Sequence, residues 1–250
     1  MRATWTILKR EVYSFFVSPM AYVLLTAWIF LTGFVFWLLC SYYAGQQLSP
    51  GSAQDSPLTA FFGQTTLFYL PLLVFVPLVT MRLIAEERNR GTLELLMTAP
   101  VNEVSVVVGK YLATLVYWVA MWLPTLLYVW LTSRYGDVDM GTIATSYVGV
   151  FGVGVYYLAI GVLMSAIAPN QVVSAVLTFL ALAALFIFGL GQYVFGDEYR
   201  ELFAYLSVWG HMESFSRGVV DTRYLIFDSS VAVVALSLAI GVLHARRVDG

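Results

Sequence analysis

The sequence predicts an all-α integral membrane protein with six transmembrane helices. Of its 250 residues, 60% are hydrophobic and only 11% are charged, whereas a soluble domain contains about 25% charged residues. The mean hydropathy of +0.81 and several long runs without Asp, Glu, Lys or Arg support the same class. We therefore expect one transmembrane domain over residues 1–250, with membrane lipid as its surroundings and no nucleic-acid partner.

The first third of the chain begins with an amphipathic segment at 3–16. Its apolar residues recur at helical spacing opposite polar ones, which is typical of a helix lying in the membrane interface; its candidate interfacial residues are Trp5, Leu8, Lys9, Arg10 and Val12. A membrane-crossing helix needs about 20 apolar residues. The first span is expected at about 19–44, and the second follows a loop rich in Gly, Ser, Pro and Gln at about 59–81.

The third span is expected at about 104–133 and contains Lys110 near its start, where a long side chain can extend to the interface. The uncharged run that follows is too long for one helix, and Pro169-Asn170 divides it into spans at about 142–168 and 172–195. Glycines in the first of these favour close helix contacts.

The sixth span is expected at about 224–245 and is preceded by short outer helices. One of these helices has an apolar stripe formed by Tyr199, Leu202, Phe203 and Leu206. Gly210 is expected to end this helix before a second short segment at 213–220.

The distribution of Lys and Arg predicts the orientation. With six spans and the N-terminus inside, nine of the 13 Lys and Arg residues face the cytoplasm and four face outward. Such an excess is typical of the cytoplasmic side, so both termini are expected there.

No pattern for catalysis or metal binding is present. The only Gly-Lys pair, Gly109-Lys110, is followed by Tyr111, which is not a P-loop, and the chain has no H-E-x-x-H. The spans hold essentially no acids, and His211 is expected to be a solvated interfacial histidine. An intramembrane enzyme would need a cofactor recruited at Gln192 or His211, which the sequence disfavours. We expect no catalytic residue, metal or bound cofactor, and an energy source in another subunit.

The segment between the second and third spans is the most informative. Asn89-Arg90-Gly91 can reverse the chain, Thr92 is suited to cap a helix, and Pro100 would end it. The short helix between them would present Leu93, Leu96 and Met97 on one side. This apolar knob either docks into a groove on a soluble partner or merely belongs to a loop that fixes topology.

The stretch from Glu86 to Pro100, Glu-Glu-Arg-x-x-Gly-Thr-Leu-Glu-Leu-Leu-x-x-x-Pro, resembles the cytoplasmic signature of ABC-2 type permeases, which are membrane subunits of ABC transporters. Within that family the chain is most similar to the gliding-motility-associated branch. This finer resemblance rests on four shorter matches: Lys9-Arg10-Glu11, Ser18-Pro19, Pro169-Asn170-Gln171 and the segment 213–219.

The resemblance implies a bacterial inner-membrane permease that pairs with a second copy or a related permease. It also implies a cytoplasmic ABC ATPase dimer, which would bind ATP and Mg, and a coupling helix between the second and third spans. The implied coupling residues are Glu86, Glu87, Arg88, Gly91, Thr92, Leu93, Glu94, Leu95 and Leu96. The implied outer segment contains Glu213, Phe215, Arg217 and Gly218.

Two functions follow from these observations. In the first, the chain couples ATP hydrolysis in its partner to export of a hydrophobic, amphipathic or polymeric substrate, with the second and third spans tilting as continuous levers. By family analogy the first, second and fifth spans line the dimer interface. In the alternative, the chain transmits mechanical work, without transport, to a periplasmic accessory protein through the segment 196–228.

Overall fold

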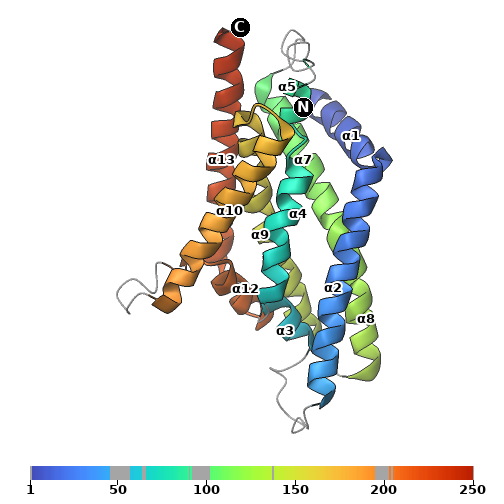
Figure 1. Ribbon diagram of the computed structural model, residues 1–250. Coiled ribbons are helices and arrows are strands. Elements are labelled where there is room, and N and C mark those ends of the chain that lie inside the picture. Colours follow the sequence, from blue (N-terminus) through green and yellow to red (C-terminus); the bar gives the residue numbers. More distant parts are fainter. Residues whose placement is uncertain are drawn as a thin grey trace.

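The computed structural model describes residues 2–45, 57–63, 66–89, 91, 102–136, 138–194, 203 and 205–249. All regular structure in these residues is helical (Figure 1), which confirms the predicted class. The elements are α1 (Arg2–Val17), α2 (Pro19–Gly45), α3 (Pro57–Gly63), α4 (Thr66–Thr80), α5 (Ala85–Asn89), α7 (Glu103–Trp122), the 3-10 helix η1 (Leu123–Thr125), α8 (Leu126–Tyr135), α9 (Met140–Ile167), α10 (Gln171–Val194), α12 (Val208–Ser216) and α13 (Thr222–Asp249).

Five helical segments of the described chain are long and apolar enough to cross a membrane, as a multi-pass membrane protein requires. They are Pro19–Ala44, Glu103–Tyr135, Met140–Ile167, Gln171–Gln192 and Thr222–Arg247. The predicted second span is divided between α3 and α4, whose apolar part, Tyr69–Thr80, is shorter. The count of six spans therefore stays a prediction. The predicted break beside Pro169 is confirmed, because α9 ends at Ile167 and α10 begins at Gln171.

The second and third predicted spans do not form continuous α-helices, so the expectation that they act as two continuous levers was wrong. Helix α4 contains Pro71 and Pro77 and ends at Thr80, and residues 81–84 form a turn before α5. The Ile84 and Ala85 amides donate instead to Ser165 Oγ on α9, at 3.0 and 3.1 Å. In the third span, η1 with its Pro124 separates α7 from α8. Proline removes a backbone donor and thereby interrupts the helical hydrogen bonds.

Helix α9 is the core of the bundle. Its most apolar window is 78% buried, against 28% for α2 and 22% for α10 and α13. Glycines allow neighbours to approach: an added Cβ would lie 2.8 Å from Phe215 at Gly149, 2.3 Å from Trp118 at Gly154 and 2.4 Å from Thr80 at Gly161. The sequence-based expectation that these small residues permit close helix contact is confirmed.

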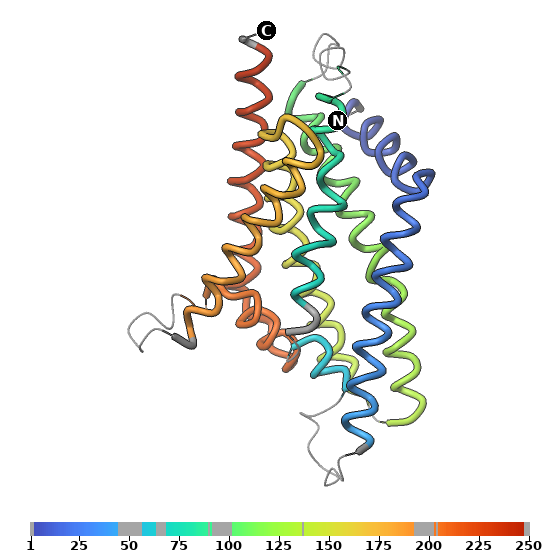
Figure 2. Tube along the Cα trace, viewed as in Figure 1, coloured from blue at the N-terminus to red at the C-terminus, as the bar shows by residue number. Residues whose placement is uncertain are grey.

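Both termini lie at the same end of the bundle, together with α5 and the start of α7 (Figure 2). We call this the charged end; α3, α12 and the end of α8 lie at the other, opposite end. Two termini on one side agree with an even number of crossings. Which end faces the cytoplasm stays a prediction.

Helix α12 differs from the expected outer helices. Gly210 was expected to break a helix but lies inside α12. Half of the predicted stripe before it, Tyr199 and Leu202, falls outside the described residues.

The close approach at Gly161 predicts that Gly161→Leu destabilises the bundle, because α4 must move away from α9. Overpacking of this kind costs about 1–3 kcal/mol, which should appear as a lower thermal unfolding midpoint in detergent. Gly241→Leu is the control, since an added Cβ there meets no atom within 4 Å. Equal midpoints for the two variants would contradict the packing of α4 on α9.

Candidate functional site

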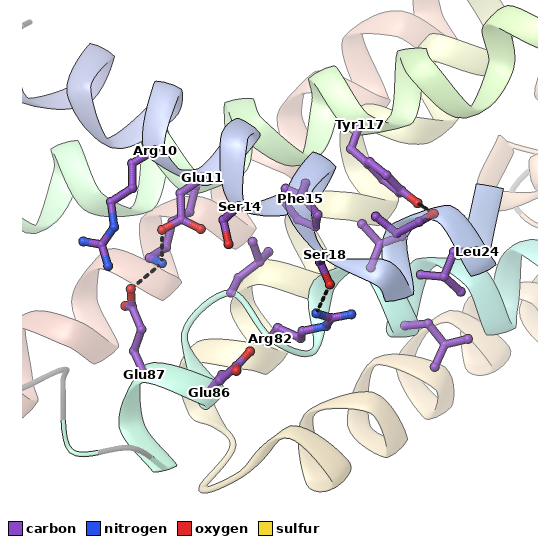
Figure 3. A pocket seen from close by; sticks show the side chains of 15 residues that line it. Arg10, Glu11, Ser14, Phe15, Ser18, Leu24, Arg82, Glu86, Glu87 and Tyr117 are labelled. Carbon is purple, nitrogen blue, oxygen red and sulfur yellow. Dashed lines mark hydrogen bonds and ion pairs between the residues drawn. The ribbon is translucent and has the colours of Figure 1, made fainter.

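One ammonium group joins three elements at the charged end. Lys110 on α7 is only 2% exposed, and its Nζ donates to Glu11 Oε1 of α1 at 2.8 Å and to Glu87 Oε1 of α5 at 2.9 Å (Figure 3). The expected extension of Lys110 into the interface was therefore wrong. A buried charge is tolerated when opposite charges and hydrogen bonds compensate its lost hydration, and the two carboxylates supply both.

The residue before Lys110 brings α1 close enough for this contact. A Cβ at Gly109 would lie 2.9 Å from Ile7 Cγ2 and 3.2 Å from the Thr4 carbonyl oxygen. Further along, the Phe15 ring stacks on Tyr117 with centroids 5.1 Å apart. Helix α1 thus lies against α7 with a face that includes Ile7, Glu11 and Phe15.

The predicted interfacial residues lie mostly on other faces of α1. Trp5, Lys9 and Arg10 are exposed, and Leu8 and Val12 are half-buried. Lys9 Nζ lies 5.2 Å from the centre of the Trp5 ring. This arrangement is compatible with α1 lying in an interface, and their contact with lipid stays a prediction.

A second set of contacts closes the end of α9. The Ala168 carbonyl oxygen accepts a hydrogen bond from Arg88 Nη1 of α5 at 3.0 Å, and the Ile167 oxygen accepts one from Arg246 Nη2 of α13 at 2.9 Å. Arg247 Nη1 lies 2.7 Å from Glu103 Oε1 on α7. The last carbonyls of a helix have no partner within it and bear partial negative charge, so basic side chains stabilise this position.

A cavity of about 250 Å³ lies between α1, α2, α4 and α7 beside the Lys110 ion pairs. Arg82 enters it from the turn after α4 and donates Nη1 to Ser18 Oγ at 3.1 Å (Figure 3). The charged side chains lining it are Arg10, Glu11, Arg82, Glu86, Glu87 and Lys110, and the apolar ones are Phe15, Ala21, Leu24, Leu78, Val79 and Leu83.

A buried polar pair lies toward the opposite end. His211 of α12 is 0% exposed and Asp228 of α13 is 1% exposed; Nδ1 of the histidine is 3.3 Å from Oδ1 of the aspartate, and its Nε2 is 2.9 Å from the Tyr205 carbonyl oxygen. Two expectations were wrong here, a solvated His211 and spans essentially without acids. The reason is tertiary: α12 packs against α9, where Gly152 leaves room for Asp228.

The predicted outer-segment residues have different environments. Phe215 is fully buried, and its carbonyl oxygen accepts a hydrogen bond from Thr145 Oγ1 at 2.8 Å. Glu213 and Arg217 form an exposed ion pair one helical turn apart. Gly218 follows α12 with φ of +82°, a conformation that favours glycine. Only Phe215 of this set belongs to the core.

At the start of α9, Asp139 accepts hydrogen bonds from the Thr142 hydroxyl and the Gly141 amide, at 2.6 and 2.9 Å. These bonds stabilise the carboxylate and lower the pKa of Asp139 below its usual range. No group of three or more His, Cys, Asp or Glu side chains in the described residues is arranged to hold a metal ion.

Comparison with known proteins gives the family. Residues 5–209 match the family described as ABC-2 family transporter protein. The chain belongs to this family. Over 201 residues this ABC-2 subunit is also 28% identical to the bacitracin transport permease protein BCRB of Bacillus licheniformis, covering 75% of this chain and 91% of that protein.

Family membership identifies the chain as a membrane subunit of an ABC transporter, a type of subunit that carries no nucleotide-binding domain, and implies a partner ABC ATPase. The family resemblance read from Glu86 to Pro100 is thus confirmed. Assignment to the gliding-motility branch is not supported by either match and stays a prediction.

The predicted coupling residues of this ABC-2 subunit are only partly described. Glu86, Glu87 and Arg88 lie on α5, and Gly91 has φ of +69°, as its expected turn requires. The other predicted coupling residues lie outside the described residues: Thr92, Leu93, Glu94, Leu95 and Leu96. The same is true of Met97, the third member of the expected apolar knob. Glu87 and Arg88 bind α7 and α9 within the subunit itself.

The ion pairs of Lys110 were missed because sequence spacing does not show which residues meet. One signal was present: a lysine inside an apolar run must find a counter-charge or reach water. Glu11 on the amphipathic segment was an available counter-charge.

Removing the Lys110 charge is expected to destabilise this ABC-2 subunit. Lys110→Met leaves Glu11 and Glu87 without their shared counter-charge, and breaking a buried pair in this way costs about 3 kcal/mol. Adding Glu11→Gln and Glu87→Gln should restore part of that loss. Thermal unfolding in detergent measures the effect, with Lys9→Met as an exposed control. A Lys110→Met variant as stable as Lys9→Met would refute the compensated ion pair.

His211 and Asp228 are expected to be energetically coupled. In a double-mutant cycle with His211→Ala and Asp228→Ala, the interaction energy should exceed about 1 kcal/mol, as for residues in one buried network. The exposed pair Glu213 and Arg217 supplies a matched cycle, expected at about 0.5 kcal/mol or less. Additive losses for His211 and Asp228 in chemical unfolding would contradict their coupling.

Proposed function

We propose that the chain couples ATP hydrolysis by a cytoplasmic ABC ATPase to export of a substrate with a large apolar part, from a bacterial inner membrane with both termini in the cytoplasm. The observation that carries this proposal is the position of Lys110. Its two ion pairs link α5, which directly precedes the predicted coupling helix, to α7 and α1.

Force from the ATPase would enter at α5. When ATP closes the ATPase subunits, a coupling helix gripped by them shifts, and α5 shifts with it. Glu87 would convey this displacement to α7 through Lys110, and Arg88 would convey it to the end of α9 through Ala168. Both contacts are charge-assisted, which makes them roughly twice as strong as neutral hydrogen bonds.

The turn at 81–84 gives this movement a hinge. Segments that absorb a change of backbone direction are usually short and lie at element ends. Ser165 Oγ accepts the Ile84 and Ala85 amides, so the turn is anchored to α9 while α4 continues on its other side. A shift of α5 would therefore change the angle between α4 and the bundle.

A second permease copy is proposed to cover the face formed by α2, α4 and α10. These helices lie side by side in Figure 1, and α4 contacts both of the others. They correspond to the first, second and fifth predicted spans. The low burial of α2 and α10 leaves apolar side chains such as Phe30, Val176 and Phe188 exposed on them, which supports either a partner copy or lipid.

An apolar groove supports a substrate of hydrophobic or amphipathic character. It is an open groove of about 290 Å³ beside η1, lined by Trp118, Val119, Trp122, Leu123, Leu126, Tyr147, Val150 and Phe151. Because the related protein is a bacitracin transport permease, bacitracin is the first compound to test.

The alternative function, force transmission without transport, has one observation in its favour. Helix α12 at the opposite end is joined to α9 and α13 by Phe215 and by the His211–Asp228 pair. A movement of α9 would therefore reach the surface to which a periplasmic protein could bind.

The coupling proposal predicts two separable defects. Leu93→Asp with Leu96→Asp should abolish co-purification of the ABC ATPase, because two carboxylates cannot enter an apolar groove. Glu87→Gln should retain the ATPase but lower ATP-driven bacitracin transport about tenfold, since a charge-assisted bond contributes about 1.5–3 kcal/mol. ATPase yield is measured after affinity purification, and transport is measured in proteoliposomes.

The matched control is Val219→Asp with Val220→Asp, which places two carboxylates on exposed residues at the opposite end. Full ATPase yield with the leucine double variant would show that docking is assigned to the wrong segment. Normal transport by Glu87→Gln would exclude the Lys110 route. A complex that hydrolyses ATP but moves no apolar compound would favour force transmission.

A further inference from the structure

We propose that the cavity at the charged end binds the headgroup of a zwitterionic phospholipid from the adjacent leaflet. Its phosphate would lie against Arg82 and Ser18, and the start of an acyl chain would lie along Leu24 and Leu78. This lipid is a bound component of the subunit and not its transported substrate.

The first argument is the unused binding capacity of Arg82. Lys110 in the same cavity is compensated by two carboxylates. Arg82 donates to Ser18 Oγ, and within the described chain no carboxylate lies within ion-pair distance of it. A guanidinium has five N–H donors in a planar fork that suits phosphate oxygens. Arg82 can therefore bind an anionic group that the described residues do not supply.

The second argument is the order of polarity across the cavity. Ser18 directly precedes α2, and Arg82 lies just past the end of α4, so both are at the charged end. Leu24 and Leu78 line the same cavity but lie within α2 and α4, further toward the middle of the bundle. A phospholipid at a leaflet surface has the same order, with its phosphate outermost and its chains inward. A free phosphate compound would leave the apolar part unfilled.

The third argument concerns size and charge. The volume of about 250 Å³ is just below the range of about 300–1,000 Å³ for pockets that enclose drug-sized ligands, so it suits a headgroup and not a whole lipid. Three basic and three acidic side chains line it: Arg10, Arg82 and Lys110, with Glu11, Glu86 and Glu87. This balanced lining favours a headgroup with one positive and one negative charge over an anionic headgroup.

The experiment is lipid binding to the purified chain in detergent, followed by native mass spectrometry. The probes are phosphatidylethanolamine, phosphatidylglycerol and the soluble headgroup compound glycerophosphoethanolamine. We expect phosphatidylethanolamine to bind most tightly, and Arg82→Gln to weaken its binding about tenfold, as expected for loss of a charged hydrogen bond. Arg82→Lys, which keeps the charge, should weaken binding less and separates loss of the site from loss of folding.

Arg134→Gln is the matched control, because Arg134 lies near the exposed end of α8, far from the cavity, and its guanidinium lies over the Trp130 ring. Equal lipid binding by Arg82→Gln and Arg134→Gln would overturn the site. Equal binding of phosphatidylglycerol would overturn the zwitterionic preference, and equally tight binding of glycerophosphoethanolamine would replace the lipid with a free phosphate compound. The assay contains neither ATPase nor transported substrate, so its failure is distinguishable from a failure of the coupling proposal.

Discussion

The ammonium group of Lys110, held away from water inside the bundle, is the constraint on which the charged end depends. Hydration lost on burial must be replaced, and in the described residues the carboxylates of Glu11 and Glu87 replace it. Satisfying this one charge places α1 against α7 and holds α5 beside both. The cavity lies between these elements and the ends of α2 and α4, and Arg82 is part of its lining. The region proposed to receive the ATPase is thereby built on an electrostatic junction and not on apolar packing alone.

Helix α9 connects this junction to the opposite end of the molecule. Its last carbonyls are bound by Arg88 and Arg246, its middle is in contact with Thr80 and Trp118 across glycines, and its first half supports α12. Near that half lies the second buried polar pair, His211 and Asp228. A closely packed helix of this kind has little freedom to deform, because protein interiors are as dense as organic crystals. Movements imposed at one end are therefore passed on as shifts of whole elements.

The turn at 81–84 lies between the closely packed core and the proposed coupling segment. The regular helix of α4 ends at Thr80, and Ser165 accepts the two amides that a continuous helix would have paired. The chain can bend there without leaving buried donors unsatisfied. A phospholipid bound at Arg82 would sit directly at this hinge, so the leaflet itself would influence how α5 moves. Coupling and lipid binding then meet in one small region formed by α1, the turn and α7.

The sequence by itself determined the features that depend on local composition and backbone chemistry. These are the membrane class, the break at Pro169, the turn at Gly91, the family signature beginning at Glu86 and the use of small residues on α9. Only the tertiary structure decided which distant side chains meet: Lys110 with Glu11 across 99 positions, His211 with Asp228, and Arg88 with the end of α9. Hydropathy averages over neighbours along the chain, so it detects spans but assigns no partner to a charge within them. A buried charge is stabilised by groups that are close in space, and their identity follows from how the helices pack.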